Sequence, residues 1–322
     1  MTAHALSVVI ALGVCTTAAA QTSVVTVKAP ADIGGPLFAP KGDRVAASVG
    51  RDRISVWSVP DGRLIQTLEV PARPAAKLFA AGGDQLLVAL RDGTIELRAV
   101  ASGATVRRMK ADAAQSTLAT TDDGRLLASA ADERITLWDA SGKVTRTFAH
   151  EFGDVAALAF SPDGTVLASA GLDANVHLWD VATGQRKASV PDQLVATFAL
   201  TFTVDGKSLL MAGAAGTIEV VDVATASVTR RLPAQKYAVF ALSVSPDGKT
   251  LAAACFDVDG ATRPAPVIIW DLGSGRLLRR LAPGTPEAIG FGPDGQLRYM
   301  LMKGPELTIG VTSPPANRRS GS

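Results

Sequence analysis

The sequence of 322 residues is 47% hydrophobic and 19% charged, with a formal net charge of +2 at neutral pH. This is a globular composition, which excludes a disordered chain or a coiled coil. Lys and Arg are scattered, with no run of five like charges. The chain therefore lacks the basic surface that a phosphate backbone requires, and we expect no nucleic-acid partner.

The first 20 residues contain no Asp, Glu, Lys or Arg, and their centre, residues 5–15 (ALSVVIALGVC), is an apolar run too short to cross a bilayer. Alanines at 18–20 provide the A-x-A pattern that signal peptidase accepts, so we expect a signal peptide over residues 1–20 and a mature chain from Gln21. Because no basic residue opens the segment, an uncleaved anchor, an ordinary apolar N-terminus and lipidation at Cys15 stay open as alternatives. The expected location is secreted or periplasmic, with membrane contact only if the N-terminus is retained or lipidated.

A hairpin signal recurs seven times after this segment. In its full form it is Ser-Pro-Asp-Gly, where Pro presets φ, Asp bonds its own downstream backbone and Gly accepts a positive φ. Short apolar runs flank each copy, such as residues 155–160 and 166–170 around the fourth. The seven glycines are 40 to 42 residues apart, except for a last interval of 47, and they are Gly42, Gly83, Gly124, Gly164, Gly206, Gly248 and Gly295. This period predicts a repeat architecture.

A third strand follows each pair, and it ends at one shared register that holds every tryptophan of the chain: Trp57, Trp138, Trp179 and Trp270. The second and fifth repeats have Arg98 and Val221 at that position. A second turn and a fourth strand then follow in six repeats. The seventh repeat instead reaches Pro314-Pro315 and a polar tail, and it lacks a fourth strand.

Residues 23–28 (SVVTVK) form a strand-like segment with no partner of its own. If this segment supplies the outer strand of the last repeat, seven four-stranded antiparallel sheets close into a ring. The predicted fold is therefore all-β, a seven-bladed β-propeller over residues 21–315, with a disordered tail at 316–322. The expected blades are approximately 31–70, 75–110, 115–149, 150–191, 195–233, 236–283 and 286–313 plus 22–29.

Over residues 22–313 the repeats resemble the WD-repeat (WD40) family, and the fourth repeat is the most complete. The resemblance implies a hydrogen-bonded set that supports this blade: His150, Ser169, Asp173 and Trp179. A buried indole N–H needs an acceptor, which is the physical reason for such a set. The third repeat keeps Ser129, Asp132 and Trp138 without a His, so the set is incomplete elsewhere.

Catalysis is not expected. The three histidines are His4 in the signal segment, His150 in the structural set and His177 on a strand, where we expect a surface or inter-sheet position. The innermost strands carry only Lys77 and Glu287 as charges, too few for a metal cage or a catalytic triad, so no metal or cofactor is expected. Propeller enzymes typically build their sites on those strands.

Two other features are interpreted structurally. Residues 257–264 begin like a calcium loop, with Asp-x-Asp-Gly, but lack the downstream bidentate Glu, so we expect an elongated surface loop. Cys255 lies in an apolar strand, where a buried thiol that packs as a small hydrophobe is expected.

The expected function is a monomeric, non-catalytic scaffold that binds a protein or peptide partner through the inter-blade loops and the turns between second and third strands. Arginines and aromatic residues are typical of binding hot spots. The candidate residues are Arg51, Arg53, Arg91, Glu133, Arg134, Phe152, Tyr237, Asp257 and Arg263. The alternative is a propeller that binds a small molecule or a sugar, or an enzyme with an unrecognised site; a polar, pocketed channel would favour it, and a lining of Ala, Leu and Phe would argue against it.

Overall fold

The computed structural model describes residues 22–28, 33–59, 61–80, 82–150, 153–171, 175–191, 196–232, 236–257, 265–281, 284, 286–303 and 306–312. Within these ranges the chain forms 28 β-strands and no helix, grouped in seven four-stranded antiparallel sheets. Among these residues there is accordingly no apolar helix of membrane-spanning length. The predicted all-β fold with seven four-stranded blades is confirmed.

Each blade follows the chain from its inner to its outer strand. Blades 1 to 3 consist of β2 (Ile33–Phe38), β3 (Arg44–Val49), β4 (Arg53–Ser58) and β5 (Leu64–Glu69); β6 (Ala76–Phe79), β7 (Gln85–Ala89), β8 (Thr94–Ala99) and β9 (Thr105–Lys110); and β10 (Thr117–Thr120), β11 (Leu126–Ala131), β12 (Arg134–Asp139) and β13 (Val144–Ala149).

The same order holds in the next three blades. Blades 4 to 6 consist of β14 (Val155–Phe160), β15 (Val166–Gly171), β16 (Asn175–Asp180) and β17 (Arg186–Pro191); β18 (Thr197–Phe202), β19 (Ser208–Gly213), β20 (Ile218–Asp222) and β21 (Ser227–Leu232); and β22 (Ala238–Val244), β23 (Thr250–Phe256), β24 (Val267–Asp271) and β25 (Leu277–Leu281). Blade 7 consists of β26 (Pro286–Phe291), β27 (Leu297–Lys303), β28 (Glu306–Thr312) and, from the other end of the chain, β1 (Thr22–Lys28).

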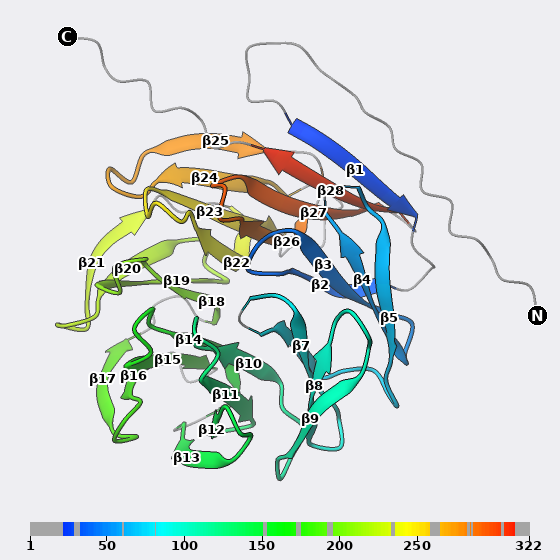
Figure 1. Ribbon diagram of the computed structural model, residues 1–322. Helices are drawn as coiled ribbons and strands as arrows, with labels where there is room; N and C mark the ends of the chain where they lie inside the picture. Colours follow the sequence, from blue (N-terminus) through cyan, green and yellow to red (C-terminus); the bar gives the residue numbers. More distant parts are fainter. Residues whose placement is uncertain are drawn as a thin grey trace, which may run out of the picture.

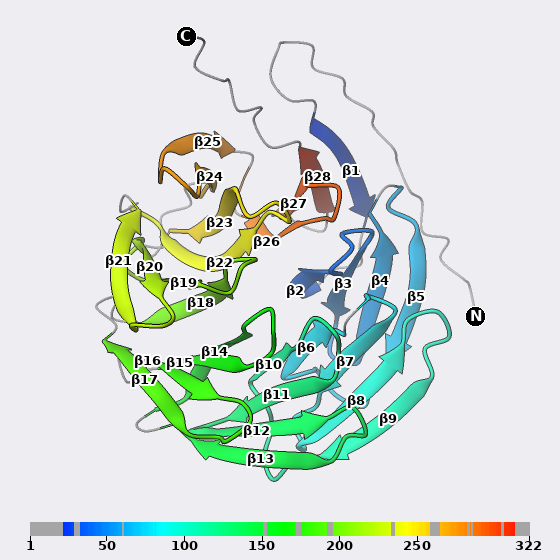
Figure 2. The same ribbon diagram turned by 60° about the vertical axis from the view of Figure 1, so that its left-hand side comes forward.

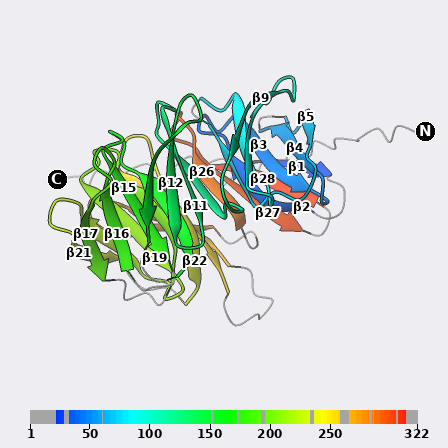
Figure 3. The ribbon, with the colours of Figure 1, turned by 90° about the horizontal axis from the view of Figure 1, so that it is seen from below.

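The seven blades form a closed ring around a central channel. Each inner strand contacts the inner strand of the next blade, and β26 of blade 7 contacts β2 of blade 1, so the circle is complete. Figure 2 shows these inner strands gathered at the centre, with β5, β9, β13, β17 and β21 at the rim. Seen edge-on, the ring is a disc whose strands run between its two faces (Figure 3).

The ring is closed by pairing between the two ends of the chain. Strand β1 lies antiparallel beside β28 over its whole length, with Thr22 opposite Thr312 and Lys28 opposite Glu306. Figure 1 shows the blue N-terminal strand next to the red C-terminal one. Closure by the N-terminal strand is thus confirmed.

The hydrophobic core lies between neighbouring blades, in seven clusters. One cluster joins Trp57 of blade 1 with Val25, Met300 and Ile309 of blade 7. Another joins Trp270 of blade 6 with Leu210 and other residues of blade 5. Because each apolar sheet face is covered by the next sheet, no blade can bury its core alone.

A repeated side-chain bracket holds the hairpin between the first and second strands of blades 3 to 6. In blade 4 the Ser161 hydroxyl donates to Asp163 Oδ1 over 2.6 Å, and the same oxygen accepts the Thr165 amide over 3.0 Å. The brackets of the other three blades have the same form: Thr121 with Asp123, Thr203 with Asp205, and Ser245 with Asp247. The glycine that follows each Asp has φ near +70°, which only glycine adopts at little cost.

These brackets make the ring sensitive to acid. The hydroxyl and amide donors hold the pKa of Asp123, Asp163, Asp205 and Asp247 below the usual value. A carboxyl whose pKa is lower in the folded state adds stability above its unfolded pKa of 3.8, and this stability is lost as the pH falls through the folded pKa. We expect the thermal unfolding temperature to drop steeply below about pH 4. With all four residues changed to Asn, stability at pH 7 should be lower and its decline between pH 5 and 3 shallower, with the remainder of the decline due to the other aspartates whose pKa is lowered, such as Asp139 and Asp180. An unchanged decline would assign acid sensitivity to those groups.

Closure predicts a cooperative loss on removing β1. Deletion of residues 22–28 should lower the unfolding temperature of the whole disc, because β28 becomes an unpaired edge and the Trp57 cluster loses its cover. Val25→Ala, which truncates a side chain that is 7% exposed, should cost roughly 1.5 kcal/mol at about 0.8 kcal/mol per buried methylene. Urea unfolding followed by tryptophan fluorescence measures both. Thr26→Ala, on the other face of the strand, is the matched control and should cost less; a deletion variant with unchanged unfolding would exclude a role of β1 in holding the ring.

Candidate functional site

The topology sends two kinds of connection to the same face of the disc. Since each inner strand starts where the second strand ends, the inter-blade loops and the turns between second and third strands lie together on one face, which we call the loop face. The Asp-Gly hairpins and the turns between third and fourth strands lie on the opposite face, the turn face. The loop face is the one that carries the sequence-predicted partner-binding residues.

Three consecutive blades each place exposed arginine on the loop face. Arg51 and Arg91 belong to the turns between second and third strands of blades 1 and 2, Arg134 begins β12 directly after the corresponding turn of blade 3, and all three are exposed. Arg51 and Arg91 form no ion pair among the described residues. Arg134 lies 3.0 Å from Asp112 of the preceding inter-blade loop, and Arg53, which starts β4, lies 3.5 Å from Asp52. The structure therefore arranges these arginines as a row across three blades.

The remaining candidates are more dispersed. Glu133 accepts the Gly153 amide over 3.2 Å. Tyr237 is half-buried against the core between blades 5 and 6, with Lys236 Nζ 5.1 Å from its ring centroid. Asp257 follows β23 and is half-buried. Phe152 and Arg263 lie outside the described residues, as does most of the 257–264 loop.

A surface pocket of about 780 Å³ opens on the loop face beside Arg134. Its polar lining consists of four carboxylates, one guanidinium, the Gln115 amide and two threonine hydroxyls, with the carboxylates provided by Asp112, Asp132, Glu133 and Asp154. The apolar part includes Phe148. The pocket is built by blade 3 and by the inter-blade loops on either side of it, and Arg134 of the arginine row is part of its lining.

β-Bulges turn side chains toward the mouth of the channel, a feature that residue types alone did not indicate. In blades 4 to 7 the register of the inner strand shifts at its second or third residue, and the bulged residues are Ala156, Phe198, Phe240 and Glu287. A bulge re-aims the extra residue. Partial desolvation raises the pKa of Glu287. The sequence does contain one sign of this feature, because Phe198 and Phe240 occupy the same position in the innermost strands of two consecutive repeats.

The two bulged phenylalanines meet a third aromatic ring. Phe198 and Phe240 have centroids 6.2 Å and 6.0 Å from Phe256, the last residue of β23. Phe198 is 36% exposed, one of the few large apolar side chains of the described residues that solvent reaches. This aromatic cluster lies at the loop-face end of the channel, across from the arginine row.

The structural set of blade 4 centres on the tryptophan. Trp179 Nε1 donates to Ser169 Oγ over 2.8 Å. His150 is buried, and its ring packs edge-on against His177 at 4.7 Å, which in turn lies 5.8 Å from Trp179. Asp173 lies outside the described residues. His177 is 3% exposed and pairs with Ser189 over 2.9 Å, so it occupies the blade interior and not the surface.

The same indole bond exists in blade 3 but not in blades 1 and 6. Trp138 donates to Ser129 over 2.9 Å. In blades 3 and 4 this serine lies on the second strand, two residues after the residue that faces the tryptophan. Blades 1 and 6 have Ala47 and Ala253 at that position. The indole nitrogens of the buried tryptophans in these two blades, Trp57 and Trp270, have no acceptor among the described residues.

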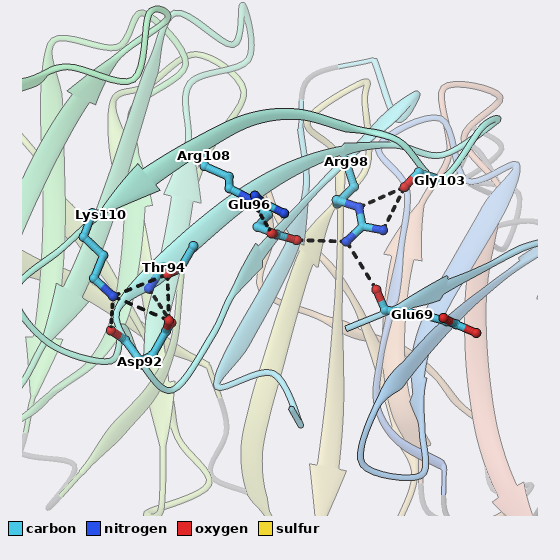
Figure 4. Close-up of polar contacts among 8 residues, drawn as sticks. All are labelled: Glu69, Asp92, Thr94, Glu96, Arg98, Gly103, Arg108 and Lys110. Carbon is cyan, nitrogen blue, oxygen red and sulfur yellow. Dashed lines mark hydrogen bonds and ion pairs between the residues drawn. The ribbon is translucent and has the colours of Figure 1, made fainter. Parts of the chain in front are cut away.

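Blade 2 replaces the tryptophan with an ion pair. Arg98 Nη1 lies 2.8 Å from Glu96, whose side chain is 5% exposed and which also accepts Arg108 over 2.8 Å. As Figure 4 shows, the Arg98 guanidinium also reaches the Gly103 carbonyl and, in blade 1, the Glu69 carbonyl over 3.3 Å. Arg98 therefore links two blades, as a tryptophan does by packing.

Glu96 belongs to a recurrent cross-strand pair between third and fourth strands. On the third strand, the residue two positions before the tryptophan, or before the residue that replaces it, faces a polar partner on the outer strand in most blades. The bonded pairs are Ser55 with Thr67, Glu96 with Arg108, His177 with Ser189 and Glu219 with Arg231. Each pair is an exact register pair. These pairs fix the outer strands, and they explain why polar groups occur inside the blades.

Cys255 is fully buried in β23, and burial raises the pKa of its thiol to about 12. A thiol that stays protonated at neutral pH is a poor nucleophile. The packing role expected from the sequence therefore agrees with its surroundings.

The comparisons with known proteins agree with this geometry. The family model of the WD domain, G-beta repeat, matches residues 142–180 and 226–261. The first match runs from β13 through β16 and ends at Trp179-Asp180, so one sequence repeat spans the outer strand of one blade and the inner three strands of the next. No curated protein sequence gives a significant match. The two matches and the ring of seven four-stranded blades together support a WD40-repeat β-propeller.

The orphaned indoles yield a stability prediction. Ala253→Ser should place a hydroxyl where blades 3 and 4 have Ser129 and Ser169, so that Trp270 gains an acceptor and the free energy of unfolding rises by about 1 kcal/mol. The control is Ala252→Ser, also fully buried but packed against blade 7, where a hydroxyl without a partner should cost about 1–3 kcal/mol. Urea unfolding measures both. Equal destabilisation by the two substitutions would mean that the indole is not short of an acceptor.

Proposed function

We propose that this propeller is a non-catalytic scaffold that binds a protein or peptide partner through its loop face, in the cell envelope or outside the cell. WD40 propellers in general bind protein partners and do not catalyse reactions. The observation that carries the proposal is the row of exposed arginines in three consecutive blades, with Phe198 exposed across the channel mouth. Arginine and aromatic side chains are the groups that dominate binding energy at protein interfaces.

The inner strands of blades 4 and 5 favour this function over binding of a small molecule or sugar on that side of the channel. The inner strands present Ala156, Leu158, Phe198 and Leu200 in blades 4 and 5, and the one carboxylate on inner strands of the described residues is Glu287. Sugar sites need several polar groups that converge. The proposed location rests on the signal-like residues 1–20. We also propose a monomeric disc, because every blade packs between two neighbours and the ring leaves only short outer edges open.

The test uses charge reversal on one face against the other. Arg51→Glu, Arg91→Glu and Arg134→Glu together should weaken the affinity for the captured partner at least tenfold, which corresponds to about 1.4 kcal/mol of binding free energy. The reason is that all three side chains lie on the proposed interface. The measurement is affinity capture of the mature chain from envelope extract, followed by titration of the purified partner.

The matched control reverses three exposed cations on the turn face: Arg63→Glu, Arg125→Glu and Lys207→Glu. This variant has the same net charge, so a general electrostatic effect would act on both variants alike. Retention of the partner by the control and its loss from the loop-face variant supports the proposal. Equal binding by both variants would remove the arginine row from the interface.

A further inference from the structure

Blade 2 places an ammonium group in a wall position that other blades fill with an aliphatic side chain. On its inner strand Lys77 lies opposite Val88 of β7. Val88 is two residues further along β7 than Leu86, which lies opposite Arg98 of β8. The register-equivalent residues of blades 3 to 7 are Leu118, Leu158, Leu200, Leu242 and Ile289. A lysine at this register is therefore not required for a blade to fold.

The neighbouring blade 1 is built around this ammonium. Lys77 Nζ donates to Ser48 Oγ over 3.1 Å and lies 3.3 Å from the Gly34 carbonyl oxygen. A Cβ on Gly34 would lie 2.8 Å from the Arg73 guanidinium, and one on Gly35 would lie 3.0 Å from Lys77 Nζ. The two glycines thus leave room for two cations side by side.

Neither cation has an acidic partner among the described residues. The strands packed against Lys77, namely β2, β7 and β10, contain no Asp or Glu, and Glu287 of blade 7 is not within ion-pair distance. Desolvation in the wall, with a smaller effect of the Arg73 charge, lowers the pKa of Lys77 to about 8. Lys77 is half-buried, whereas Arg73, in the loop before β6, is exposed. A desolvated charge in a protein is normally paired, and the described residues provide no acidic counter-charge for Lys77.

We propose that Lys77, Arg73 and Ser48 form an oxyanion site in the channel between blades 1 and 2, which takes a carboxylate or a phosphate-type group. The ammonium has a third N–H that the two acceptors of blade 1 leave open, and Arg73 offers planar paired donors suited to either anion. Ser48 can donate its hydroxyl proton to the anion while it accepts from Lys77. The site is independent of the loop-face partner, because a free small anion can occupy it.

The test titrates the full mature chain with sulfate and with acetate at constant ionic strength, by isothermal calorimetry and thermal shift. Sulfate keeps its charge between pH 7 and 9, so it isolates the titration of Lys77. We expect saturable binding at pH 7 that weakens about tenfold by pH 9, since only the protonated amine binds and its pKa is about 8. If sulfate binds more tightly than acetate, the site takes a phosphate-type ligand. If acetate binds more tightly, the site takes a carboxylate.

Lys77→Leu is the decisive variant, because leucine occupies this register in blades 3 to 6. It should unfold at an equal or higher temperature than the natural chain and lose anion binding at least tenfold. Arg51→Leu removes an exposed loop-face cation as the matched control and should keep the affinity. Absence of saturable binding, or an equal loss in both variants, would overturn the site while leaving the partner-capture result untouched.

Discussion

The pairing of β1 with β28 is the constraint on which the other contacts depend. It joins the two ends of the chain, and without it blade 7 would have only three strands and the cluster around Trp57 would open on one side. Since each blade packs only against its neighbours, a break at one interface exposes two sheet faces at once. The offset between the sequence repeat and the blade, seen in the match over residues 142–180, is what makes such closure possible.

Within a closed ring, the same position of the third strand can hold different residue types, as long as their buried polar groups are hydrogen-bonded. Trp179 bonds to Ser169, whereas Arg98 bonds to Glu96 and to carbonyls on two blades. Both solutions anchor the third strand and bridge to a neighbour. A buried ion pair is costly if incomplete, and the several partners of Glu96 and Arg98 keep this one satisfied. Departures from the family pattern therefore weaken neither blade count nor closure.

The sequence was sufficient to predict what depends on local spacing. The Asp-Gly turns and the tryptophan register gave the number of blades, and the strand-like residues 23–28 gave the closure, because each is a property of one segment. It was not sufficient for what depends on a neighbour. Arg98 could be interpreted only as a missing tryptophan, since the sheet register is what brings Glu96 and Arg108 together with it. For His177 a surface and an inter-sheet position both stayed open, because its partner Ser189 lies on another strand.

The candidate site divides in the same way. The arginines of the loop face follow from topology alone, since turns between second and third strands share one face. The aromatic cluster does not, because a bulge in the inner strand is needed to aim Phe198 and Phe240 at Phe256. Lys77 was visible in the sequence as a charge on an inner strand, but its meaning comes from Ser48 and the Gly34 carbonyl of the adjacent blade.

A rigid disc determines what kind of recognition these groups can perform. The arginine row and the aromatic cluster lie on opposite sides of the channel mouth and cannot approach each other, because closure fixes every blade. A partner that engages both must span the mouth, and it meets preformed side chains at little ordering cost to the scaffold. Arg73, in the exposed loop that precedes β6, and Lys77, on that strand, belong to a different part of the ring from the aromatic cluster of blades 5 and 6. Because the proposed anion site needs no partner, the same rigid disc can take a small anion and a loop-face partner independently.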